Sequence, residues 1–164
     1  MADLLSHAAV AVILKAGTGG RMPAVFVAGT ILPDVASRVP SIILGYIHVH
    51  LVPLPEWWLF AWEPMHQPVG MTILAYLVSM FFCVSVRRAV FCNLLGGMSL
   101  HMLMDVLQSH HGAGYMLGFP FGVQAFELGW IGSEATVPFA APLCAIAWWL
   151  ARRSEGRSAP AQEK

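Results

Sequence analysis

The sequence contains long apolar stretches without charged residues, and two of them end at a pair of arginines. Val69 to Val86 ends at Arg87-Arg88, and Ala135 to Ala151 ends at Arg152-Arg153. A helix of about 20 apolar residues can cross the hydrocarbon core of a bilayer, which is roughly 30 Å thick. Between these stretches, Ala89 to Gln108 is apolar apart from a few polar side chains. The sequence therefore predicts an all-α, polytopic membrane bundle with three spans.

The composition agrees with a chain embedded in membrane lipid. Hydrophobic residues make up 57% of the 164 residues and charged residues only 11%, whereas soluble domains carry about 25% charged residues. The formal net charge is zero, which removes the electrostatic basis for binding nucleic acid. We expect one membrane domain over residues 1–152 and a disordered polar tail over residues 153–164.

The N-terminal third predicts shorter helices. Leu4 to Leu14 and Met22 to Leu32 are apolar, and the glycine-rich segment between them, residues 15–21, is typical of a turn. We expect a helical hairpin whose arms are each too short to cross a bilayer, with Pro33 ending the second arm. Ile42 to Val52 predicts either a third short helix or a surface segment.

The basic residues near the ends of these elements predict the orientation in the membrane. Lys15 and Arg21 lie in the hairpin turn, and the two arginine pairs follow spans. The positive-inside rule places all of them in the cytoplasm of a multi-pass protein of the inner (plasma) membrane. Trp62 and three other tryptophans would then form an outer aromatic belt, and Trp148 would belong to an inner one. Five polar side chains fall at a similar depth near the extracytoplasmic face: His7, Asp34, His66, His101 and Asp105.

His101 and Asp105 are the most informative of the five. Residues four apart lie on the same helix face. An uncompensated Asp near the bilayer centre costs roughly 2.5–3.5 kcal/mol, so both side chains are expected to face a shared partner. A metal ion is the simplest such partner. For the other three the sequence leaves alternatives open, because Asp34 could cap a helix, His7 could be a core histidine and His66 could be an interfacial histidine.

Three imidazoles and two carboxylates form a mixed nitrogen and oxygen ligand set. This set suits Zn²⁺, with Fe²⁺ or Mn²⁺ as alternatives. Five groups exceed the ligands of one four-coordinate zinc, so either one of them supports the others or the site holds two ions. A bound ion could activate water for attack on an ester or phosphoester, with Asp34 or Asp105 as general base. Four further histidines could support the site, carry protons or be solvated: His48, His50, His110 and His111.

Five segments, in this order along the chain, form a pattern: Ser6-His7, the Gly-x-x-x-Pro-Asp segment Gly29–Asp34, the loop residue His66, the Gly-x-x-x-His-x-x-x-Asp helix Gly97–Asp105, and Phe119-Pro120-Phe121. The pattern resembles the YdjM-like, LexA-binding inner-membrane metal-dependent hydrolases. Its arrangement of His and Asp on helices around a metal is also similar to the site of zinc-dependent phospholipase C. The resemblance implies a helical membrane fold and a metal held by the five residues named above. The family often has a second Asp where this chain has Ala36, and Arg-Gly where it has Gln67-Pro68.

Three functions are compatible with these residues. The leading hypothesis is a membrane metal-dependent hydrolase acting on a lipid-like ester or phosphoester. The same residues could form a path for protons or divalent cations in a transporter, or they could serve packing in a non-catalytic structural or interaction protein. The cytoplasmic halves of the predicted spans offer few polar side chains beyond Ser79, Ser85 and Asn93, which favours a site over a path. The sequence leaves the substrate and the oligomeric state open.

Overall fold

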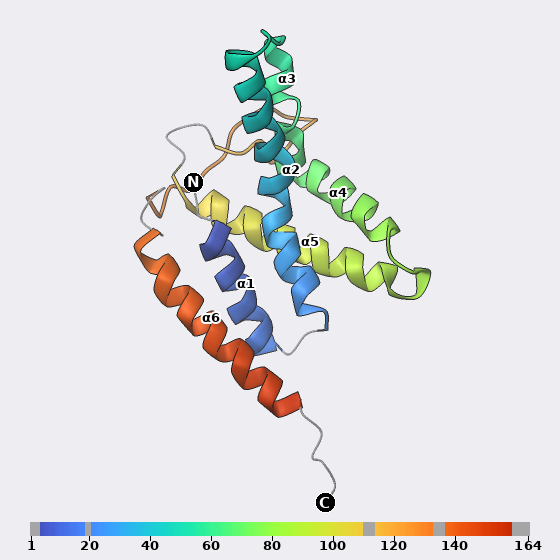
Figure 1. The fold of residues 1–164 in the computed structure, drawn as a ribbon, viewed down its shortest axis with the longest axis vertical. Coiled ribbons are helices and arrows are strands. Elements are labelled where there is room, and N and C mark those ends of the chain that lie inside the picture. Colours follow the sequence, from blue (N-terminus) through green and yellow to red (C-terminus); the bar gives the residue numbers. More distant parts are fainter. Residues whose placement is uncertain (1–3, 19–20, 110–113, 133–136, 159–164) are drawn as a thin grey trace, which may run out of the picture.

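The computed structural model describes residues 4–18, 21–109, 114–132 and 137–158. Within these ranges the chain forms helices, turns and two isolated β-bridges, which confirms the all-α prediction. The elements, most of them labelled in Figure 1, are α1 (Leu4–Thr18), α2 (Pro23–His50), α3 (Glu56–Phe60), the 3-10 helix η1 (Glu63–His66), α4 (Pro68–Met80), α5 (Val84–Leu107) and α6 (Val137–Ser158).

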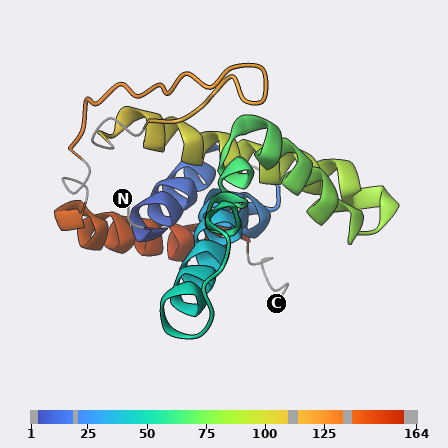
Figure 2. The ribbon, with the colours of Figure 1, turned by 90° about the horizontal axis from the view of Figure 1, so that it is seen from above.

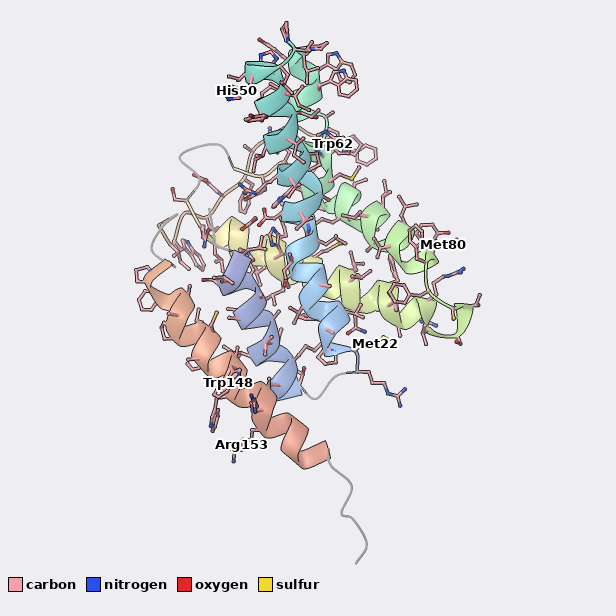
Figure 3. The ribbon with its side chains drawn as sticks, viewed as in Figure 1. Met22, His50, Trp62, Met80, Trp148 and Arg153 are labelled. Atoms are coloured by element: carbon pink, nitrogen blue, oxygen red, sulfur yellow. The ribbon has the colours of Figure 1, made fainter. Side chains whose placement is uncertain are left out.

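The helices are arranged around one central crossing. In Figure 1, α2 stands upright and crosses in front of α5, and these two helices make the most extensive contact in the molecule. Helix α4 packs along α5, while α1 packs against both α2 and α6, as the view from above in Figure 2 also shows. The second half of α2, together with α3, extends beyond the other helices. Figure 3 therefore places His50 and Trp62 near one end of the molecule, and Trp148 and Arg153 near the other.

Glycines allow α2 and α5 to approach closely at their crossing. A Cβ on Gly29 would overlap the carbonyl oxygen of Leu94, and a Cβ on Gly97 would overlap the carbonyl oxygen of Phe26. Small residues at such crossings let two helix backbones touch. The crossing fixes where the residues one or two turns further along each helix meet, and these include Asp34 and His101.

Helix α2 is longer than the sequence analysis predicts. Pro33 was expected to end the second arm of a hairpin, but Pro33 and Pro40 both lie inside one continuous helix. The expected short element Ile42–Val52 is the continuation of that helix, which ends at His50. A proline removes one helix hydrogen bond, yet Pro33 is fully buried. Packing against neighbouring helices therefore holds the backbone helical where local propensity would end it.

The predicted span Val69–Val86 is wrong as a continuous helix. Helix α4 ends at Met80, and α5 begins at Val84, after Cys83 with an extended backbone (φ −55°, ψ 144°). The 13 residues of α4 rise about 20 Å, which is short of the roughly 30 Å hydrocarbon core. In the described part of the chain, two helices are long and apolar enough to cross a membrane, namely α2 and α5.

The C-terminal and N-terminal helices also extend past their predicted ends. The predicted span Ala135–Ala151 corresponds to α6, which continues to Ser158, so the first part of the expected disordered tail is helical. Residues 159–164 of that tail lie outside the described residues. Helix α1 continues through Lys15, which was expected in a turn. The Lys15 ammonium instead donates to Asn93 Oδ1 on α5 at 3.0 Å and so connects the two helices.

Candidate metal centre

The five predicted site residues meet in one buried cluster. His7 lies in α1, Asp34 in the middle of α2, His66 at the end of η1, and His101 and Asp105 near the end of α5. The exposed fraction of each is 6% or less. Four separate segments of the chain thus contribute imidazoles and carboxylates to one interior volume.

The carboxylate of Asp105 is the centre of the cluster. Its Oδ2 lies 2.9 Å from His66 Nε2 and 3.2 Å from His101 Nε2, and its Oδ1 lies 3.2 Å from His7 Nε2. The nitrogens of His66 and His101 are themselves 3.1 Å apart. Three imidazole nitrogens from three different segments therefore converge on one carboxylate.

The neighbours of His66 Nδ1 are compatible with metal binding at the other ring nitrogen. The Ser37 hydroxyl donates to the Pro33 carbonyl at 2.8 Å, so its oxygen is an acceptor for His66 Nδ1, 3.3 Å away. The other neighbour of Nδ1 is a carboxylate oxygen of Asp34, at 3.6 Å. With acceptors beside it, Nδ1 can keep its hydrogen in a hydrogen bond, which leaves the Nε2 lone pair available to a metal ion. Nε2 lies 2.9 Å from Asp105 Oδ2, so a metal ion could bind both atoms, and without an ion an Nε2–H would donate to the carboxylate.

Asp34 is joined to a basic side chain on the same helix. Arg38, one turn further along α2, donates from Nε to Asp34 Oδ1, with the guanidinium side chain one-third exposed. Asp34 lies inside α2 and is buried, so the alternative role of a helix cap does not apply. Among the described residues, its second oxygen has no hydrogen bond or ion pair.

Tyr115 closes the cluster from the segment that follows α5. Its hydroxyl donates to Asp105 Oδ2 at 2.8 Å, and its ring stacks on the His66 ring with centroids 5.3 Å apart. Reciprocal backbone hydrogen bonds of 2.9 Å pair Tyr115 with Phe126. Burial, together with the neighbouring Asp105 carboxylate, raises the pKa of the Tyr115 hydroxyl. The hydroxyl therefore stays protonated and acts as a donor.

A close backbone contact positions His66. A Cβ on Gly70, in the first turn of α4, would overlap the carbonyl oxygen of Pro64 in η1. The 3-10 turn therefore sits directly on the start of α4, and the Gln67 amide donates to the Pro64 carbonyl at 3.1 Å. This packing turns a loop histidine into a buried one, so the alternative role of an interfacial histidine does not apply.

The remaining histidines lie elsewhere. Near the end of α2, His48 Nδ1 accepts a hydrogen bond of 2.8 Å from the amide of Leu54, which follows the helix. The exposed His50 packs against Tyr46. Both follow Asp34 by several helical turns and take no part in the cluster. His110 and His111 lie outside the described residues.

Two overlapping groups of side chains could hold a metal ion. One consists of His7, His101 and Asp105, and the other of Asp34, His66 and His101, with the ligand atoms of each group within 4.8 Å of one another. Imidazole nitrogen and carboxylate oxygen are the donor types that Zn²⁺, Fe²⁺ and Mn²⁺ accept. The buried residues therefore fit a divalent metal, and their chemistry leaves its identity open among these three.

Three residues at the cluster were not predicted from the sequence: Ser37, Arg38 and Tyr115. Arg38 carried a usable signal, because it follows Asp34 by four residues and such pairs share a helix face. Ser37 would share a face with Pro33 only if the helix continued through the proline. Tyr115 follows Asp105 by ten residues outside any helix, so no periodicity could point to it.

Comparison with known proteins gave no relative on which the function could be based. No protein-family model, no curated protein and no solved structure matches this chain.

Proposed function

We propose that the protein is a membrane-embedded, metal-dependent hydrolase of an ester or phosphoester, in the manner of the YdjM-like enzymes that its sequence resembles. The observation that carries the proposal is the convergence of His7, His66 and His101 on Asp105, with Asp34 buried beside them. Burying five ionisable groups from four segments is costly unless they bind an ion or each other in a fixed geometry.

The surface of the helices supports the membrane part of the proposal. Large apolar side chains point outward along several helices and expose half or more of their area, among them Ile42, Tyr46, Tyr76, Leu103 and Trp148. Soluble monomers rarely expose contiguous apolar surface on this scale. We propose a multi-pass topology in which α2 and α5, the two helices long and apolar enough to cross a membrane, are spans and α6 is a third span.

The predicted orientation is consistent with the two ends of the molecule. Trp62, expected at the outer membrane interface, and Arg153, expected in the cytoplasm, lie at opposite ends in Figure 3. Aromatic residues and arginines at these positions are typical anchors at the two interfaces of a membrane. We therefore propose an inner-membrane protein in contact with lipid.

The two carboxylates have different roles in this proposal. Both oxygens of Asp105 already lie against imidazoles and Tyr115, so Asp105 serves as a ligand. Among the described residues, the second oxygen of Asp34 has no hydrogen bond or ion pair, so Asp34 is the group that can take a proton from the attacking water. A divalent cation would polarise the ester and make that water more acidic. Because the two candidate ligand groups share His101, we expect one ion per chain.

Metal analysis of the purified protein tests the proposal. We expect about one equivalent of zinc, iron or manganese per chain in the wild type, and loss of that metal in His101→Ala. The matched control is His50→Ala, which removes an exposed histidine at the end of α2 and should leave the metal content unchanged. Hydrolysis of 4-nitrophenyl acetate and bis(4-nitrophenyl) phosphate should follow the metal content. A wild-type protein that contains no metal after purification without chelators would overturn the proposal.

A further inference from the structure

We propose that Arg38 binds a phosphate group of the ligand, so that the centre takes a phosphoester rather than a carboxylic ester. This inference rests on the proposed function and specifies its substrate class. Arg38 is the only Lys or Arg between Arg21 and Arg87. It lies inside α2, a helix long and apolar enough to cross a membrane, where an arginine is costly and usually functional.

The Arg38 guanidinium lies at the candidate metal centre, and only some of its N–H donors form hydrogen bonds to described residues. Its Nε donates to Asp34 Oδ1, and the same oxygen lies 3.6 Å from His66 Nδ1. Among the described residues, the two terminal amino groups of Arg38 have no hydrogen-bond partner. An arginine offers five N–H donors in a planar fork that matches the oxygens of phosphate. Because the side chain is one-third exposed, these free donors remain accessible to a ligand.

The charge of the centre favours an anion once a cation is bound. Two carboxylates and one guanidinium give the centre a net charge of −1 when the three histidines are neutral. A divalent cation changes this to +1. A phosphoester keeps its negative charge at neutral pH and balances the centre, whereas a carboxylic ester is neutral and gains nothing from the guanidinium. Asp34 thus fixes an arginine fork beside the position where an anionic substrate would meet the cation.

Phosphate binding by the metal-loaded protein tests this role without any assay of turnover. Radiolabelled inorganic phosphate is equilibrated by dialysis against wild type, Arg38→Gln, Arg38→Lys and the control Arg87→Gln. Arg87 lies at the start of α5, where its guanidinium donates to the backbone carbonyls of Met80 and Phe82. We expect Arg38→Gln to bind phosphate about tenfold more weakly or worse. Arg38→Lys should be intermediate, because it keeps the charge and loses the fork, and Arg87→Gln should match the wild type.

A structural role of Arg38 predicts a different result. If Arg38 only neutralises Asp34, the Gln variant would lose stability or metal, yet its metal-loaded fraction would bind phosphate as tightly as the wild type. That result, or a metal-loaded wild type that binds no phosphate, overturns the inference while the proposed function stands. If neither the wild type nor any variant holds metal, the proposed function fails instead. The same comparison is then run on metal-free protein, where equal phosphate affinity of wild type and Arg38→Gln overturns the inference and a weaker Arg38→Gln supports it.

A competition experiment identifies the source of the phosphate. Dihexanoyl phosphatidic acid and glycerol 3-phosphate carry the same phosphomonoester and differ in their acyl chains. We expect the lipid to displace labelled phosphate at the lower concentration, because the centre lies between apolar helices. Equal potency of the two competitors would assign the site to water-soluble phosphoesters, and failure of both to compete would overturn the inference.

Discussion

The two halves of α2 have similar apolar sequences but different surroundings. Between Phe26 and Ser37 the helix contributes six buried positions, including Asp34, whereas no residue after Ser37 is buried. In the second half, Ile42 and Val49 expose 68% and 71% of their area. The first half is covered because glycines let α5 reach its backbone. Close backbone approach, rather than apolar composition, therefore decides where the buried centre forms.

Two glycines on the same helix give the sharpest test of this comparison. Gly29→Ala places a methyl group against the Leu94 carbonyl, while a Cβ on Gly45 meets nothing within 4 Å. We expect Gly29→Ala to lower the free energy of unfolding by about 2–3 kcal/mol through overpacking. Gly45→Ala should be neutral or raise it by up to about 1 kcal/mol. Unfolding in mixed detergent micelles measures both, and equal effects would contradict the role assigned to the crossing.

Two tyrosines compare the candidate metal centre with the second half of α2, the part after Ser37. Tyr115→Phe removes the 2.8 Å hydrogen bond to Asp105, and we expect metal affinity to fall about 10- to 100-fold because groups that orient a ligand have effects of this size. Tyr46→Phe removes a hydroxyl from a side chain that is 61% exposed and should change the affinity less than twofold. Competition with a chromophoric zinc chelator measures the two constants. Unchanged affinity in Tyr115→Phe would show that Asp105 needs no such support.

Two serines test the orientation of His66. Ser37→Ala removes the acceptor at 3.3 Å from His66 Nδ1, so we expect metal affinity to fall about tenfold, at the lower end of such orienting effects. Ser41→Ala, one turn further along α2, removes hydrogen bonds to the carbonyls of Ser37 and Leu59 and should leave metal affinity unchanged. If the two variants have equal affinities, Ser37 does not orient His66.

The smallest effect on stability is expected from a substitution in the second half of α2, after Ser37. Val49→Ala shortens a side chain that is 71% exposed, so the unfolding free energy in detergent should change by no more than about 0.5 kcal/mol. The matched change in the covered region is Val90→Ala, where the side chain is 1% exposed and a loss of about 2 kcal/mol is expected from the cavity. A large loss in Val49→Ala would indicate that this half of α2 packs against protein after all.

The sequence predicts the end of α5 well and the course of α2 poorly, and proline explains the difference. The apolar run of α5 contains no proline, and its predicted end at Gln108 lies one residue past the observed end at Leu107, although the helix begins at Val84, before the predicted start at Ala89. In α2, Pro33 and Pro40 have strong local preferences that oppose a helix. Tertiary packing overrides them, and such packing cannot be read from local pattern.

The candidate ligands were predictable because ionisable residues are conspicuous in an apolar chain. The five expected residues lie together, but their role as metal ligands stays a prediction until metal is measured. What surrounds them was less predictable. Arg38 belongs to neither the ligand types nor the ends of spans, and Tyr115 lies outside any helix, where its backbone pairs with Phe126.

The spread of the centre along the chain has a consequence for its biosynthesis. A nascent chain that has been made as far as Met80 already carries His7, Asp34 and His66, yet it lacks Asp105, on which the imidazoles converge. Until α5 is synthesised and inserted, the Nε2 atoms of His7 and His66 lack the Asp105 carboxylate that they contact in the finished fold. Metal capture would then be the last step of assembly, and a truncated or misinserted chain would be distinguishable from a finished one by its failure to retain the ion.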